Sequence, residues 1–233
     1  MEAAATAVLS SRLKSHASVF CAVDCSLPGL LAGRVEGARI SGAAWQSRKN
    51  LTCRSLDFRV RGAELDGGAL LATGLLTLRA PARGGGAVVF TPGDLGNFLA
   101  HPLLAAAAAR AVEGRPFAFA PRSVAFGRDG TVRFSGACGG ADYACVLHPP
   151  PPPPARVDIL SPPVPRPVRV DATGGPNAAA VSAGLSRFFS TLSIDLEGTR
   201  LRYADVAVAP DAVTLTLRLS LEVTRFPRAD FTF

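Results

Sequence analysis

The chain has 233 residues, of which 48% are hydrophobic and 18% are charged, and this composition excludes a generally disordered chain. Its apolar runs are far shorter than the roughly 18 residues that a membrane-spanning helix needs. The net charge of +7 comes almost entirely from arginine, because Lys14 and Lys49 are the only lysines. The arginines are spread along the chain. They suit either an ordinary solvated surface or an anionic partner such as a phospholipid headgroup or nucleic acid.

The first third of the chain predicts a helix followed by strands. Residues 2–20 have the apolar spacing of an amphipathic helix that continues into the fold. We expect strands over 19–23, 34–41 and 51–61, with one helical turn over 27–33. In the third strand apolar and charged residues alternate, which predicts one wet face. A further strand is expected to end at Pro81, with the three glycines that follow it in a hairpin loop.

Residues 88–114 predict a short strand that turns into the most apolar helix of the chain. Thr91 can cap this helix, Pro92 fits its first position, and Asp94 completes a capping box at the positive end of the helix dipole. Pro102 predicts a kink or restart, and the glycine that closes the stretch is expected to end the helix. A helix with so few charges has to be covered on almost all sides.

The second half predicts a hairpin, a proline spacer and a second helix. The dipeptide Asp129-Gly130 separates two short alternating segments and marks a hairpin turn. A strand is expected over 143–147, and six prolines over 149–154 favour an extended polyproline II segment. Residues 177–192 have the apolar spacing of a helix.

The C-terminal part gives the clearest strand pattern and completes the predicted fold class. Residues 213–223 alternate strictly, and 201–208 form the partner strand, with a bulge near Ala204. These elements predict an α+β fold in which a long, curved antiparallel sheet is wrapped around a few apolar helices. We expect one domain over residues 1–233 that contains a Pro-rich insertion at 149–167.

No motif for catalysis or metal binding is present in the sequence. It contains no GxSxG elbow, HExxH pair, Walker loop or GxGxxG fingerprint. The five cysteines form no CxxC pair and the three histidines lie in separate elements, so neither a metal nor a cofactor is expected. The cysteines are expected to be buried free thiols, with a disulfide between Cys138 and Cys145 as an open alternative.

Three blocks of sequence carry a resemblance to a known family. They are LLAGRVEG at 30–37, the strand ending in LRAP together with VVFTPGDLGNFLAHPLL at 88–104, and LEGTRLRY at 196–203 with the hairpin that follows. Together these blocks resemble the LmeA-like family of phospholipid-binding proteins, which is found in bacteria and in photosynthetic lineages including plastids. The resemblance spans roughly residues 5–227.

The resemblance implies a fold related to tubular lipid-binding (TULIP) proteins, in which a curved sheet around helices leaves an apolar groove. It implies a non-enzymatic protein that binds or transfers an anionic phospholipid and contacts membranes peripherally. In plastid or algal members it implies a chloroplast location; otherwise the expected location is the cytoplasm. For each candidate for the groove, packing in a dry core is the more common role of such a residue. The candidates are apolar residues of the predicted helical segments: Leu27, Leu30, Leu31, Phe98, Leu99, Leu103, Phe188 and Phe189.

Two other function classes are weighed against lipid binding. The Pro-rich insertion could recruit an SH3-like or WW-like reader, which would make the chain a protein-interaction module. Nucleic-acid binding through arginine is the weaker alternative, because no aromatic platform is interleaved with the basic residues, and no nucleic-acid partner is expected.

Overall fold

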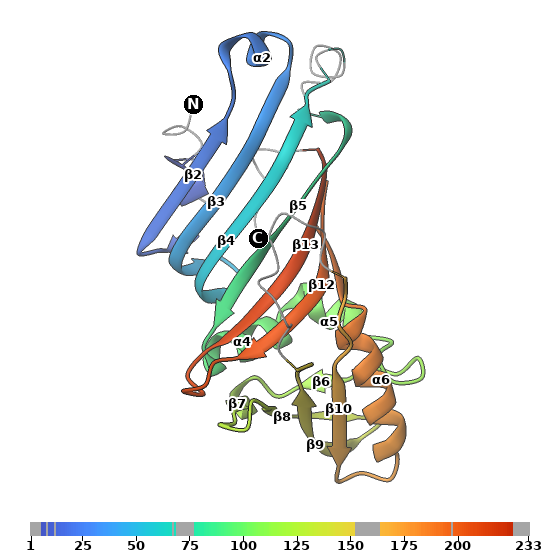
Figure 1. Ribbon diagram of the computed structural model, residues 1–233. Helices are drawn as coiled ribbons and strands as arrows, with labels where there is room; N and C mark the ends of the chain where they lie inside the picture. Colours follow the sequence, from blue (N-terminus) through green and yellow to red (C-terminus); the bar gives the residue numbers. More distant parts are fainter. Residues whose placement is uncertain are drawn as a thin grey trace.

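The computed structural model of the chain describes residues 6–7, 9–11, 13–66, 68, 77–151, 164–196 and 198–225. Two antiparallel sheets carry most of these residues, and α4 and α5 lie between them (Figure 1). The predicted α+β class with long antiparallel strands is confirmed. The structure divides the predicted strands between two sheets, whereas the sequence predicted one. Neither sheet closes into a barrel.

The larger sheet has eight strands in the order β1-β3-β4-β5-β13-β12-β11, and β2 pairs with β3 on the β1 side. Its longest members hold 14, 13 and 14 residues and form the extended half of the molecule. The strands are β1 (Leu13–Ser15), β2 (Ser18–Asp24), β3 (Arg34–Ser47), β4 (Thr52–Glu64), β5 (Thr77–Phe90), β11 (Ser193–Leu196), β12 (Thr199–Val208) and β13 (Leu215–Arg225).

The predicted hairpin loop at the glycine run is wrong, because β5 continues through Pro81 and all three glycines. Gly84 pairs with Val60 on one side and with Leu221 on the other. A Cβ at Gly84 would collide with the carbonyl of Arg59, so β4 approaches β5 more closely there than a side chain allows. The glycines therefore shape a central strand where they were expected to end one.

The smaller sheet has five strands in the order β10-β9-β8-β6, and β7 also pairs with β8. The predicted hairpin at Asp129-Gly130 is confirmed, since β7 pairs with β8 across it. The strands are β6 (Ala118–Phe119), β7 (Ala125–Phe126), β8 (Val132–Cys138), β9 (Ala141–His148) and β10 (Arg169–Thr173). Most of the predicted Pro-rich insertion, residues 152–163, lies outside the described residues.

The central helix begins as predicted and ends earlier. Thr91 Oγ1 accepts from Asp94 N–H at 3.2 Å, and Asp94 Oδ2 accepts from Thr91 N–H at 3.0 Å, so the capping box is complete. α4 (Pro92–Ala100) then stops and α5 (Pro102–Ala108) restarts, as Pro102 predicted. α5 ends six residues before Gly114, because residues 109–117 form turns and a bridge between Val112 and Arg115.

The second long helix, α6 (Ala178–Ser190), completes the edge of the smaller sheet. Three serine hydroxyls on one face of this helix accept hydrogen bonds from backbone N–H groups in and just before β10. Ser182 accepts from Ala172 at 2.8 Å, Ser186 from Val170 at 2.8 Å, and Ser190 from Val168 at 3.0 Å. Serines spaced four residues apart lie on one face of a helix, so this row replaces the missing strand beside β10. The short helices are α2 (Leu27–Leu31) and η1 (Pro121–Ser123).

Candidate lipid-binding site

The larger sheet has an apolar inner face and a polar outer face. Leu217 of β13 is paired with Val88 of β5, and Val88 with Leu56 of β4. The period of two places Phe58 and Val60 on the same face. All of these side chains belong to the hydrophobic clusters of the protein, which identifies this face as the inner one.

One end of the inner face is closed by α4 and by the smaller sheet. α4 contacts β4 and β5 on one side and β6 and η1 on the other. A Cβ at Gly96 would collide with the carbonyl of Pro121, so the helix meets η1 backbone to backbone. Phe98 stacks on Phe90 with ring centroids 5.3 Å apart. We call this the closed end.

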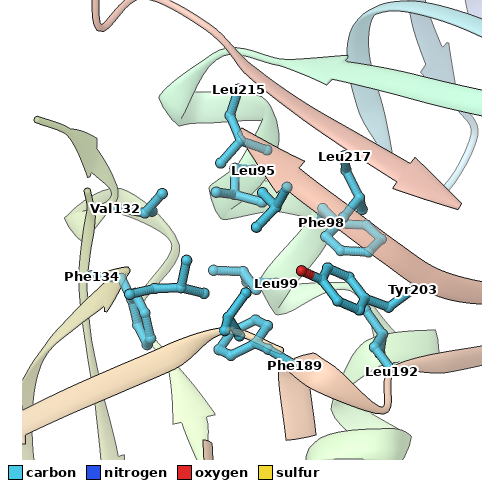
Figure 2. A pocket seen from close by; sticks show the side chains of 13 residues that line it. Leu95, Phe98, Leu99, Val132, Phe134, Phe189, Leu192, Tyr203, Leu215 and Leu217 are labelled. Carbon is cyan, nitrogen blue, oxygen red and sulfur yellow. The ribbon is translucent and has the colours of Figure 1, made fainter. Parts of the chain in front are cut away.

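A small cavity lies inside the closed end (Figure 2). Its volume is about 40 Å³, enough for about three water molecules, whereas ligand pockets measure roughly 300–1,000 Å³. The closed end as it stands therefore has no room for an acyl chain. The lining comes from α4, α6 and both sheets: Leu95, Phe98, Leu99, Val132, Phe134, Leu147, Val168, Phe189, Leu192, Tyr203, Val206, Leu215 and Leu217.

The hydroxyl of Tyr203 is the one polar side-chain group in this lining, and it has a hydrogen-bond partner. Its hydroxyl donates to the carbonyl oxygen of Arg166 at 2.8 Å. Burial raises the pKa of Tyr203, and the neighbouring carboxylate of Asp205 adds to the rise, so the phenol stays neutral. Asp205 is itself buried and lies 3.4 Å from Arg166 Nη1. The cavity is thus chemically inert as well as small.

The other end of the inner face, towards α2, is less covered, and we call it the open end. Ile40 of β3, paired with Phe58, is 36% exposed, and Val60 is half-buried. A second apolar cluster begins here around Ala63, Ala82 and the end of β13. Phe58 packs against this cluster and also against the closed-end core. The apolar side chains therefore form one continuous path from the open end to α4, and we call it the apolar track.

The structure places the predicted groove residues in three different settings. Phe98, Leu99 and Phe189 meet around the small cavity, with Leu99 only 2% exposed. Phe188 is buried in the aromatic cluster beside them, whereas Leu103 is partly exposed on α5. Leu27 and Leu31 lie on α2 at the opposite end of the sheet and are 73% and 83% exposed; the side chain of Leu30 lies outside what the structure describes (Figure 1).

His101 joins α4 to α5 and is almost fully buried. Its Nδ1 accepts from Leu103 N–H at 3.3 Å and caps α5, while Nε2 has no partner among the described residues. Burial lowers the pKa of this imidazole, and the positive charge of Lys49 lowers it further. The junction between the two helices thus needs a neutral histidine.

The outer face of the larger sheet carries an excess of arginine. Arg39 clamps the Asp57 carboxylate with two hydrogen bonds of 3.0 and 2.7 Å, and Arg59 approaches it at 3.4 Å. These contacts hold the pKa of Asp57 below its usual value, and the hydrogen bond from Arg39 contributes most to this shift. The register also places the carboxylates of Asp24, Asp57 and Glu222 on this surface, whereas Asp195 and Asp205 are ion-paired with Arg200 and Arg166. Six further arginines lie on it, and we call it the arginine face: Arg39, Arg59, Arg61, Arg83, Arg202 and Arg218.

The residues of the apolar track were not predicted from the sequence. The alternation of Leu56, Phe58 and Val60 was visible, but it does not say which stretch of a strand a helix covers. The signal that was available is the small size of Gly84 and Gly86, which lie on the inner face of β5 and were assigned to a loop.

The cysteines and the described helices bear on other kinds of site. All five cysteines are free, so the alternative of a bond between Cys138 and Cys145 is excluded. Burial raises the pKa of Cys53 to about 11 and that of Cys145 to about 12, which keeps both thiols protonated.

Within the described ranges, no group of three or more His, Cys, Asp or Glu side chains is placed to hold a metal ion. No helix in that part of the chain is long and apolar enough to cross a bilayer.

The larger sheet thus combines an apolar track on its inner face with an excess of arginine on its outer face. The chain matches the family model described as LmeA-like phospholipid-binding over residues 2–218, and it belongs to this family. Comparisons with curated proteins and with solved structures find no match. The family predicted from the three sequence blocks is confirmed; the plastid type and the chloroplast location stay predictions.

Proposed function

We propose that the protein binds a phospholipid by laying an acyl chain along the apolar track of the larger sheet. The observation that carries this proposal is the contrast between the two ends of that track. The cavity at the closed end measures about 40 Å³, whereas the open end offers apolar side chains such as Ile40 directly to a ligand. The proposed role is binding, with transfer between membranes as its extension, and not catalysis.

The dimensions of the track suit one acyl chain. From Glu64 to Leu56, β4 spans roughly 26 Å at about 3.3 Å per residue, and one leaflet of a bilayer core is about 15 Å thick. Burying each methylene contributes about 0.8 kcal/mol, so a chain of about 16 carbons contributes on the order of 10 kcal/mol before ordering costs. A long, curved sheet used in this way would be related to the TULIP architecture.

The predicted groove residues keep a part in this proposal. Phe98, Leu99 and Phe189 form the inner wall at which the track ends, while Leu27 and Leu31 lie at its entrance. Leu103 and Phe188 support α5 and the aromatic cluster behind the wall. The acyl chain therefore rests on β3, β4 and β5 and stops at α4.

The headgroup proposed for this ligand is anionic. The arginine face adds cationic charge to the same sheet, and arginine forms forked hydrogen bonds to phosphate. Association with vesicles should therefore require anionic lipid and weaken as salt rises, because exposed charges are screened within about 8–10 Å at physiological ionic strength. Sedimentation with neutral and anionic vesicles at several salt concentrations measures this, and equal binding throughout would contradict it.

The track itself is tested by a pair of charge insertions on neighbouring strands. Ile40→Asp puts a carboxylate on the inner face, and Phe20→Asp puts one on the outer face, where Phe20 is 52% exposed. Both sites are open to water, so both variants should fold. Native mass spectrometry of the purified proteins should find phospholipid retained by wild type and by Phe20→Asp but lost from Ile40→Asp.

If Ile40→Asp retains as much lipid as wild type, the result would contradict binding along the apolar track. The alternative function, recruitment of an SH3-like or WW-like reader by the Pro-rich insertion, stays a prediction.

A further inference from the structure

The end of the larger sheet at α2 exposes two leucines close together. α2 forms the turn between β2 and β3, and Figure 1 shows it at the opposite end of the sheet from α4. Leu27 and Leu31 are one helical turn apart, so they lie on one side of this turn. Their exposed fractions, 73% and 83%, exceed those of Phe20 and Ile40.

The position of these leucines connects solvent to the apolar track. Gly33, directly after α2, accepts from Leu65 N–H at 2.7 Å, which ties the turn to the end of β4. Val35 follows two residues later and packs in the open-end cluster with Val60 and Ala63. An apolar chain that leaves a membrane beside Leu31 would thus meet apolar side chains from there to Phe58.

The charges around this end favour a surface with anionic headgroups. Arg34 is paired with Glu64 at 3.4 Å. Asp24, Glu36 and Asp66 lie at this end of the strands together with Arg79 and Arg225, so the outermost part carries little net charge. The arginine face begins about three residues below it, at the row of Arg61 and Arg83, which is roughly 10 Å along the strands. Interfacial segments bury their apolar side about 5–10 Å deep, which would bring this row to the level of the phosphates.

We propose that the α2 end docks on a bilayer containing anionic phospholipid. Leu27 and Leu31 enter the hydrocarbon boundary, and the arginine face lies against the headgroup layer. The inference rests on the proposed function in one respect, because docking in this orientation presents the open end of the track to the lipids that it is to bind.

The leucines are tested by binding to vesicles made of equal parts phosphatidylcholine and phosphatidylglycerol. The double variant Leu27→Ser/Leu31→Ser should bind at least tenfold more weakly than wild type, since transfer of each leucine from water contributes about a factor of ten or more. The matched control is Val164→Ser/Val213→Ser, which removes two exposed apolar side chains elsewhere and should bind like wild type.

The arginine face is tested with the same vesicles. Arg83→Gln/Arg202→Gln removes two charges from this face and should weaken binding several-fold, with a shallower dependence on salt. Arg122→Gln/Arg128→Gln removes two charges beside the smaller sheet and should have little effect. Equal losses in both pairs would mean that net charge, and not this face, attracts the protein.

The docking proposal is overturned if wild type does not bind these vesicles, if the leucine variant binds within twofold of wild type, or if its control loses as much. Retained phospholipid, measured by native mass spectrometry on the same proteins, separates this outcome from the proposed function. A leucine variant that keeps its lipid but leaves the vesicle supports docking through α2. A wild type that binds vesicles and retains no lipid contradicts the track and leaves docking supported.

Discussion

The closed and open ends of the larger sheet share one apolar face and differ in what covers it. At the closed end, α4 and the smaller sheet bury Phe98 and Leu99 and leave a cavity of about 40 Å³. At the open end, the same face continues through Phe58 to Ile40 with much less cover. The alternation of a strand decides which side chains are apolar, but the elements packed on it decide whether they form a core or a binding surface.

The largest difference between the two ends is expected for a buried charge. Phe98→Asp places a carboxylate in the packed interior at a cost of several kcal/mol, so the protein should not fold. Ile40→Asp leaves its carboxylate in contact with water and should lower the free energy of unfolding by about 1 kcal/mol or less. Urea denaturation followed by circular dichroism compares the two. A folded Phe98→Asp protein would mean that the closed end opens readily.

A methyl group tests how tightly α4 is held. Gly96→Ala would drive a Cβ into the carbonyl of Pro121, which should lower the free energy of unfolding by about 1–3 kcal/mol. Gly93→Ala, in the same helix, places its methyl no closer than 4.0 Å to Thr91 Oγ1 and should be neutral or slightly stabilising. Thermal unfolding of both variants measures the difference, and equal melting temperatures would contradict the close contact with η1.

A larger side chain sharpens the comparison without adding charge. Leu99→Trp overfills the closed end and should cost roughly 1–3 kcal/mol while the retained lipid is unchanged. Val60→Trp adds volume at the open end, where stability should hardly change and lipid should be displaced. The denaturant midpoint and the lipid content are measured for each variant. Lipid lost from Leu99→Trp with stability unchanged would place the ligand at α4 after all.

The smallest effect is expected from pH at the junction of α4 and α5. Because burial lowers the pKa of His101 below 6.5, the unfolded chain binds this proton more readily than the folded protein. Stability should therefore be full above about pH 6.5 and fall as the pH drops below it. His101→Asn keeps a side chain that can cap α5 but does not titrate, so its urea midpoint should change less between pH 7.5 and 5. An identical pH profile in both proteins would rule out this role.

Local signals in the sequence predicted the central helix well and the N-terminal segment poorly. The helix expected over residues 2–20 is wrong in its second half, because residues 13–15 and 18–24 form β1 and β2. The capping box of Thr91 and Asp94 and the restart at Pro102 depend on residues within one turn, and both are confirmed. The bulge near Ala204 is confirmed by the register shift between Tyr203 and Asp205. Gly84 to Gly86 were misassigned because glycine runs usually mark loops, whereas here the close approach of β4 to β5 requires glycine at Gly84 and Gly86.

The site was less predictable because exposure depends on partners distant in the sequence. Leu31 and Leu99 are both leucines in apolar helical segments, and the sequence placed them in one groove. The structure buries Leu99 between two sheets and leaves Leu31 at the opposite end, which only the pairing of the strands decides. Phe58 joins the two hydrophobic clusters for the same reason and carries no local mark of it.

Photo-crosslinking with a phospholipid that carries a reactive group near the middle of its acyl chain locates the bound ligand most directly. The lipid is loaded onto wild-type protein and the complex is irradiated. The labelled peptides are then identified by mass spectrometry. Binding along the apolar track predicts label on the inner-face residues of β3 and β4, chiefly Ile40, Phe58 and Val60. Label confined to α4, α6 or the smaller sheet, with these strands unmarked, would contradict it.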